Sequence, residues 1–142
     1  LSPRGKGVGV GAVLLALTLA TPSLGQVIPT GTPAADILLS QAIAEQRLVL
    51  TCTAFWGDPH DLLVTRWTGD VAAAVTLLTA AAVPAEAIAA FQSAAAPDAL
   101  LPAPDALFED VRQLCATDPD WIGKVNRMQM IQLATRLPEV LK

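Results

Sequence analysis

Apolar residues recur at spacings of three and four along most of the chain from residue 33 onward. The clearest stripe, between residues 59 and 83, consists of Leu63, Trp67, Val71, Val75, Leu78 and Ala82. This spacing is typical of amphipathic helices, whereas half-buried strands require sustained alternation with β-branched residues, which the sequence lacks. The pattern therefore predicts an all-α fold, a small bundle of about five helices with no sheet.

The expected helices cover about residues 33–55, 59–83, 84–93, 105–116 and 119–137. Thr32-Pro33, Asp58-Pro59 and Asp118-Pro119 each place a capping side chain before a proline. Proline is tolerated at the first helical position because its missing N–H has no partner there. Pro84 and Pro138 are expected to end the second and fifth helices, and the proline-rich segment 94–106 is interpreted as a loop.

Both cysteines fall on the apolar sides of their helices. The apolar side of the first helix holds Ile37, Leu38, Leu48, Val49 and Cys52, and its polar side holds Asp36, Ser40, Arg47 and Thr51. The apolar side of the fourth helix holds Leu107, Phe108, Val111, Leu114 and Cys115. Two inward-facing cysteines in one small domain are expected to form one disulfide if the compartment is oxidising; two separate buried thiols are the alternative.

The first 25 residues have the layout of a secretory signal peptide. Arg4 and Lys6 precede an uncharged run from residue 8 to 20, and Ser23 and Gly25 occupy the positions that a signal peptidase recognises. We expect a signal peptide at 1–25, an extended leader at 26–32 and a single helical domain at 33–142. A retained membrane anchor is the alternative, although this run of about 13 residues is shorter than the ~20 that span a bilayer.

The charge excludes a nucleic-acid-binding role. The chain has 9 basic and 13 acidic residues. Two of the basic residues, Arg4 and Lys6, lie in the signal segment, which leaves a formal charge of −6 on residues 26–142. Nucleic-acid-binding proteins normally carry a clustered basic face, and no such cluster occurs in this sequence. The expected product is an acidic, periplasmic or secreted protein.

The segment TCTAFWGDPHD, residues 51–61, contains Cys52 and the single histidine, His60. A thiolate activated by a histidine would make a nucleophile. The predicted disulfide would remove that thiolate, and His60 is more simply interpreted as a residue in the first turn of a helix. Zinc sites require three or four ligands at close spacing, which this chain does not offer. We therefore predict no catalytic residues, no metal and no cofactor.

Two further features suggest candidate sites. Glu45 falls on the apolar side of its helix, so it is either a buried acid that could act as a proton switch or a residue that reaches solvent at the edge. The fifth helix has one apolar line of Trp121, Val125 and Met128 and another of Ile122, Leu133 and Leu137. Either both lines pack in the core, or the first forms a surface for a protein partner.

The segment LCATDPDW, residues 114–121, places the second cysteine shortly before a helix-starting turn and a terminal helix. With the signal peptide and the earlier cysteine helix, this order resembles a group of small exported bacterial two-cysteine helical proteins. It is similar in outline to the acid-stress chaperones of the bacterial periplasm. The resemblance implies a fold and an exported location more than an activity. Our leading hypothesis is a binding or accessory role, such as chaperone activity, toward an unknown protein partner or client. A membrane-anchored accessory subunit is the alternative, and a thiol enzyme using Cys52 and His60 is a third hypothesis.

Overall fold

The computed structural model describes residues 28–142, so the predicted signal peptide and the start of the leader lie outside the described residues. Helices hold 71% of the described residues and strands hold none, which confirms the all-α prediction. The helices are α2 (Pro33–Cys52), α3 (Asp58–Ala80), α4 (Ala85–Ala95), α5 (Pro97–Leu100), α6 (Phe108–Ala116), α7 (Trp121–Arg127) and α8 (Leu133–Val140).

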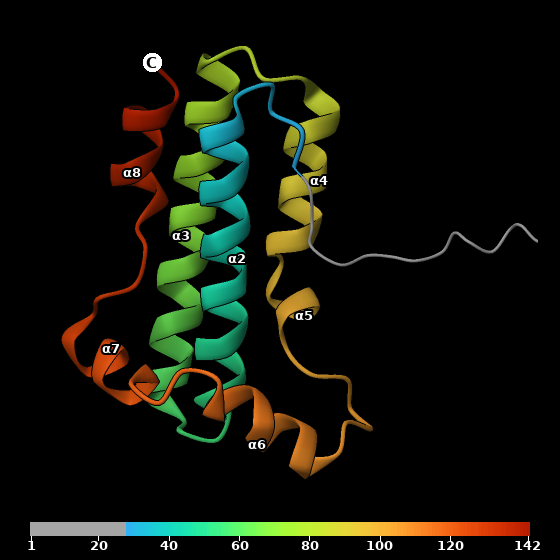
Figure 1. The fold of residues 1–142 in the computed structure, drawn as a ribbon, viewed down its shortest axis with the longest axis vertical. Coiled ribbons are helices and arrows are strands. Elements are labelled where there is room, and N and C mark those ends of the chain that lie inside the picture. The colour runs from blue at the N-terminus through green and yellow to red at the C-terminus, as the bar shows by residue number, and fades with distance from the viewer. Residues whose placement is uncertain (1–27) are drawn as a thin grey trace, which may run out of the picture.

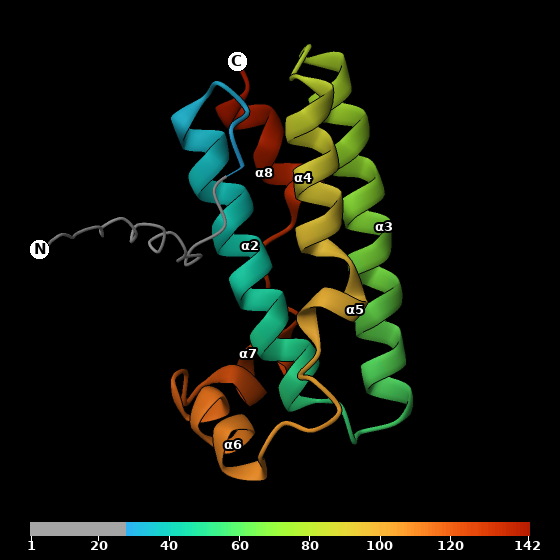
Figure 2. The same ribbon diagram turned by 90° about the vertical axis from the view of Figure 1, so that its right-hand side faces the viewer.

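The two long helices α2 and α3 run antiparallel through the centre of the molecule (Figure 1). Helix α4 packs against both of them, and α5 continues its line toward the end where α2 stops. Helix α8 packs against the other side of α2 and α3. Helices α6 and α7 lie across the end of the molecule where α2 stops and α3 begins (Figures 1 and 2). The C-terminus lies at the opposite end.

The hydrophobic core fills the space between α2, α3, α4 and α8. Its largest fully buried side chains include Leu39, Leu50, Leu78, Phe91, Leu133 and Leu137. The stripe predicted for α3 is largely confirmed, because Leu63, Trp67 and Leu78 are buried and Val71 and Val75 are partly buried against the core. Its last member, Ala82, is exposed because the helix has already ended and the backbone there has a φ of 60°.

The described part of the leader contains no helix or strand, and its first residue, Ile28, is fully buried in the core. Asp36 in the first turn of α2 holds this segment in place. Its carboxylate accepts hydrogen bonds from the backbone N–H of Thr30, at 2.9 Å, and from the Thr30 hydroxyl. Thr32 is the N-cap residue, but it makes no side-chain capping bond, so the predicted role of its hydroxyl is wrong.

The predicted capping roles of Asp58 and Asp118 are also wrong. Helix α3 begins at Asp58 itself, and its N-cap is Gly57, whose φ of 69° favours glycine. Helix α7 begins two residues after Pro119, at Trp121. The Asp118 carboxylate instead accepts the backbone N–H of Asp120 at 3.1 Å, which forms a turn before the helix.

The described residues form seven helices rather than about five. Helix α5 lies inside the segment interpreted as a loop, and the predicted fifth helix is divided into α7 and α8. The division occurs at Met128, which adopts a left-handed conformation with a φ of 53°. A single straight helix with two apolar lines would leave one line in water, whereas two helices can each turn their own apolar side inward.

Pro138 does not end the last helix, because α8 continues to Val140. In a helix of eight residues, a proline at this position removes one backbone hydrogen bond, the one to the carbonyl of Ala134. The predicted helix faces were also wrong at several positions, among them Leu107 and Phe108, which are 66% and 76% exposed. Ile37 is 58% exposed, while Thr51 is buried and its hydroxyl donates to the Leu100 carbonyl at 3.2 Å.

Candidate functional site

A disulfide joins Cys52, the last residue of α2, to Cys115 in α6, which confirms the predicted pairing. The two Cα atoms are 5.8 Å apart, within the usual range for a disulfide. Both cysteines are half-buried rather than deep in the core. The bond therefore attaches α6 to the end of the bundle instead of crosslinking the core itself.

His60 does not face a thiol. Its Nδ1 lies 3.1 Å from the Thr53 hydroxyl oxygen, and the Thr53 hydroxyl lies 2.8 Å from the Val49 carbonyl, to which it donates. Because a hydroxyl donates only one proton, His60 Nδ1–H is the donor to Thr53. The sulfur of Cys52 is in the disulfide and provides no thiolate. The segment 51–61 thus consists of a crosslink, a turn and a helix start.

Ion pairs hold the turn before α7. Lys124 Nζ lies 2.6 Å from Asp118 Oδ2 and 3.9 Å from Glu45 Oε2. The hydrogen bond from Lys124, followed by the one from the Asp120 backbone, lowers the pKa of Asp118 below its ordinary value of 3.8. The same pair raises the pKa of Lys124 above its ordinary value. A second pair joins Arg127 to Asp120 at 2.8 Å.

Helix α6 carries an ion pair of its own, between Glu109 and Arg112 one turn apart. The hydrogen bond from Arg112 lowers the pKa of Glu109 below its ordinary value of 4.5. Both carboxylates with a lowered pKa therefore lie in the α6–α7 region. Their charged forms stabilise this end of the molecule only while the pH stays above their pKa values.

Glu45 lies in the middle of α2 with its side chain 15% exposed. Its Oε1 accepts a hydrogen bond from the backbone N–H of Ile131 at 2.6 Å, and Lys124 approaches its other oxygen. The candidate buried acid is therefore mostly buried and has a backbone partner and a cation nearby. In this position it holds the segment between α7 and α8 against α2.

The three residues of the candidate partner surface do not share one exposed face. The Trp121 ring packs on Trp56, with centroids 5.3 Å apart, and it also contacts the core. Val125 is buried in the core. Met128 is exposed where the chain turns out of α7.

A different set of apolar side chains is exposed at the disulfide-linked end, which we call the apolar end. It consists of Phe55, Trp56, Leu62, Leu107, Phe108, Ile122 and Met128. These residues belong to the α2–α3 turn, the start of α3, α6 with the residue before it, and α7 with the residue after it, all at one end in Figure 1. Phe55 is 96% exposed and Phe108 is 76% exposed. Among residues 28–142, the one other exposed large hydrophobic side chain is that of Ile37.

Within residues 28–142, no helix combines the length and the apolar content needed to cross a membrane. The same part of the chain contains no group of three or more His, Cys, Asp and Glu side chains placed to hold a metal ion. No protein-family model matches the chain, and neither the search of curated proteins nor that of solved structures found a significant match. The assignment of function therefore rests on the sequence and the geometry alone.

Proposed function

We propose that this protein is exported and uses its apolar end to bind apolar segments of other proteins, as a chaperone-like or accessory factor. The observation that carries the proposal is the concentration of exposed large apolar side chains at one end of the molecule. Exposed apolar residues scattered singly are normal, whereas a concentration of them is typical of interaction surfaces. Phe55 and Phe108 provide the most exposed aromatic rings.

The disulfide supports both parts of this proposal. A disulfide between Cys52 and Cys115 is compatible with an oxidising, exported location, where such bonds persist. It also keeps α6 attached to α2 although no residue of α6 is fully buried. The apolar end can therefore adapt to a bound segment without separating from the bundle.

Acid is the proposed trigger for stronger binding. The charge of −6 on residues 26–142 becomes positive when the carboxylates are protonated, and repulsion between like charges loosens compact states. The ion pairs of Asp118 and Glu109, both in the α6–α7 region, are lost under the same conditions. We expect this region to open before the bundle does and to expose more apolar surface.

The test is suppression of aggregation of an acid-sensitive reporter protein, measured by light scattering at neutral and at strongly acidic pH. The proposal expects suppression in acid, reduced by the double substitution Phe55→Ser with Phe108→Ser. Ile37→Ser is the matched control because Ile37 is exposed but lies away from the apolar end. No suppression at either pH, or equal suppression by the double variant, would reject the proposed function.

Export is tested separately by intact mass of the protein produced in a bacterial host. A chain that starts at Gln26, and that reacts with a thiol-blocking reagent at two sites only after reduction, supports signal cleavage and oxidation. A chain that retains residues 1–25 in purified membranes supports the membrane-anchored accessory subunit instead.

A further inference from the structure

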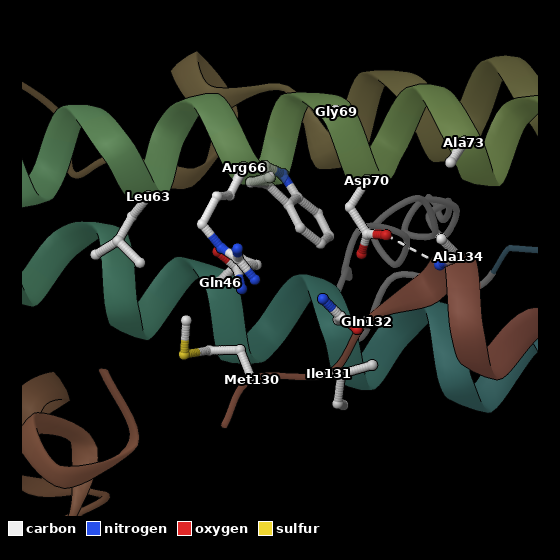
Figure 3. Close-up of a pocket in the computed structure, with 11 residues that line it drawn as sticks. Gln46, Leu63, Arg66, Gly69, Asp70, Ala73, Met130, Ile131, Gln132 and Ala134 are labelled. Atoms are coloured by element: carbon white, nitrogen blue, oxygen red, sulfur yellow. Dashed lines mark hydrogen bonds between the residues drawn. The ribbon is translucent and has the colours of Figure 1, made fainter. Parts of the chain in front are cut away.

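A cavity of about 330 Å³ lies between α2, α3 and residues 130–134, the segment that connects to α8 and begins it (Figure 3). The residues that line the cavity are different from those of the apolar end. The two sets are adjacent at one place, the start of α3, where Leu63 lines the cavity and Leu62 belongs to the apolar end. Pockets for small molecules are mostly apolar with a few polar groups that fix orientation, and this volume corresponds to the small end of their range. The cavity therefore has the size for a small ligand.

Gln46 supplies an unpaired polar group inside this cavity. Its side chain is only 5% exposed and lines the cavity from α2, as Figure 3 shows. Within residues 28–142 its side-chain amide has no hydrogen-bond partner. Buried amides are normally satisfied, because an unpaired one loses its hydrogen bonds to water without replacement. Gln46 is thus an orphaned donor and acceptor directed toward a space that a ligand could fill.

Arg66 supplies a positive charge on the opposite wall. Its side chain extends from α3 toward the cavity, and no carboxylate in the described range forms a salt bridge with it. Asp70, one helical turn later, is its expected partner. However, the two oxygens of Asp70 accept the backbone N–H groups of Leu133 and Ala134, at 2.7 and 2.9 Å. The guanidinium therefore remains available.

The other residues that line the cavity indicate which kind of ligand it can bind. Leu63, Trp67 and Met130 provide apolar surface beside the two polar groups. A guanidinium binds a carboxylate through two parallel hydrogen bonds, and a side-chain amide N–H can donate a further one. The negative charge of Asp70 at the same cavity disfavours a second carboxylate on the ligand.

From this geometry we infer that the cavity binds a small monocarboxylate with an apolar body. The carboxylate lies between Arg66 and Gln46, and the apolar body lies against Leu63, Trp67 and Met130. Such a ligand would satisfy the buried amide and neutralise the unpaired guanidinium. A simple organic acid and an α-amino acid share this chemistry, and the experiment below separates them.

The experiment is titration of the ¹⁵N-labelled full chain with phenylacetate, phenylalanine and phenylacetamide, followed by NMR and calorimetry. The informative signals are the Gln46 side-chain NH₂ and the Trp67 indole N–H, which donates to the Ala95 carbonyl at 2.7 Å. Saturable shifts of both signals with phenylacetate, and none with the neutral phenylacetamide, are expected. Tighter binding of phenylalanine than of phenylacetate would identify the ligand class as amino acids, with the same carboxylate site.

Two variants and one control test the assignment of residues. Arg66→Gln is expected to weaken binding about tenfold or more, because it removes the charge-assisted hydrogen bonds from the guanidinium to the ligand carboxylate. Gln46→Leu is expected to weaken binding roughly fivefold while preserving the fold, because an unpaired amide is replaced by an apolar group of similar size. Arg136→Gln, which changes an exposed arginine of α8, is expected to leave affinity unchanged.

The inference fails under any of three results. One is the absence of saturable shifts with both acids up to millimolar concentration. Another is equal binding of the neutral amide. The third is unchanged affinity in the Arg66→Gln variant. None of these results affects the aggregation assay, so failure of this site is distinguishable from failure of the proposed function.

Discussion

The four-helix bundle and the α6–α7 end of this molecule are stabilised by different interactions. The bundle of α2, α3, α4 and α8 holds nearly all of the fully buried side chains. In contrast, α6 contains no buried residue and α7 contains only Val125. The end is held by one disulfide, a tryptophan pair and surface ion pairs.

This contrast indicates how a small protein can carry an exposed apolar surface. Burial of apolar area provides most of the stability of a domain, so the bundle can fold without contributions from the end. Surface ion pairs contribute little by themselves, which leaves the disulfide as the main attachment of α6. The apolar residues of the end are then free to serve binding, because the fold does not depend on their burial.

The largest expected effect comes from removing the disulfide that attaches α6 to the bundle. The double substitution Cys52→Ala with Cys115→Ala should lower the free energy of unfolding by roughly 4 kcal/mol, because it frees a loop of about 60 residues in the unfolded chain. Hydrogen exchange should show that amides of α6 and α7 exchange by local opening and become the least protected, whereas bundle amides lose no more protection than the fall in global stability requires. Exchange of α2, α3 and α8 together with α6 and α7 in one cooperative step would contradict the separation of the two regions.

The same leucine-to-alanine change should have different effects in the two regions. Leu133→Ala in the core is expected to cost about 3 kcal/mol, because it removes buried contacts and leaves a cavity. Leu107→Ala, at a side chain that is 66% exposed, should change stability by less than about 0.5 kcal/mol. Urea unfolding of both variants measures the difference, and similar losses would disprove the contrast.

A smaller effect is expected at the N-terminus of α8. Asp70→Ala removes the carboxylate that accepts the N–H groups of Leu133 and Ala134, and loss of such a cap costs about 1 kcal/mol. Asp105→Ala is the matched control, since Asp105 is exposed and its side chain makes no hydrogen bond within the described residues. Denaturant titration of both variants should separate them; equal stabilities would show that the cap contributes nothing.

The smallest effect concerns pH. The pKa of Asp118 is lower in the folded protein than its ordinary value of 3.8, mainly because Lys124 donates to the carboxylate. The stabilisation is complete above that value and is lost as the pH falls through the lower, folded value. Asp118→Asn should therefore reduce the loss of stability that occurs below about pH 4. Thermal unfolding across this range tests it, and a variant as acid-sensitive as the parent chain would contradict it.

Helical phase and cysteine number were sufficient to predict the fold class and the disulfide. The predicted cysteine pairing was confirmed although several residues, such as Ile37 and Thr51, were assigned to the wrong side of their helix. The pairing required only that Cys115 lie close to the end of α2, where Cys52 is. The buried face of α2 is wider than a single apolar stripe, and Gln46 lies on this face between Ile43 and Val49. That spacing was available in the sequence and could have indicated a buried amide.

The break between α7 and α8 could not be predicted from local sequence. Between Trp121 and Leu137 there is no proline, and the single glycine, Gly123, lies inside α7. The chain leaves the helix because distant carboxylates accept its amides: Glu45 bonds Ile131, and Asp70 bonds the first residues of α8. Such long-range bonds override local propensity, and without them the cavity beside Arg66 would not exist.

The carboxylate of Asp70 also has a consequence for the order of folding. It bonds a backbone amide 63 positions later, and Glu45 bonds one 86 positions later. Contacts between distant residues form slowly, whereas the α2–α3 hairpin brings together neighbouring segments. We therefore expect the hairpin to assemble early and the C-terminal segment to dock last. Until it docks, the sides of α2 and α3 that α8 covers stay open to water. Docking of the C-terminal segment therefore determines when this apolar surface is protected from aggregation.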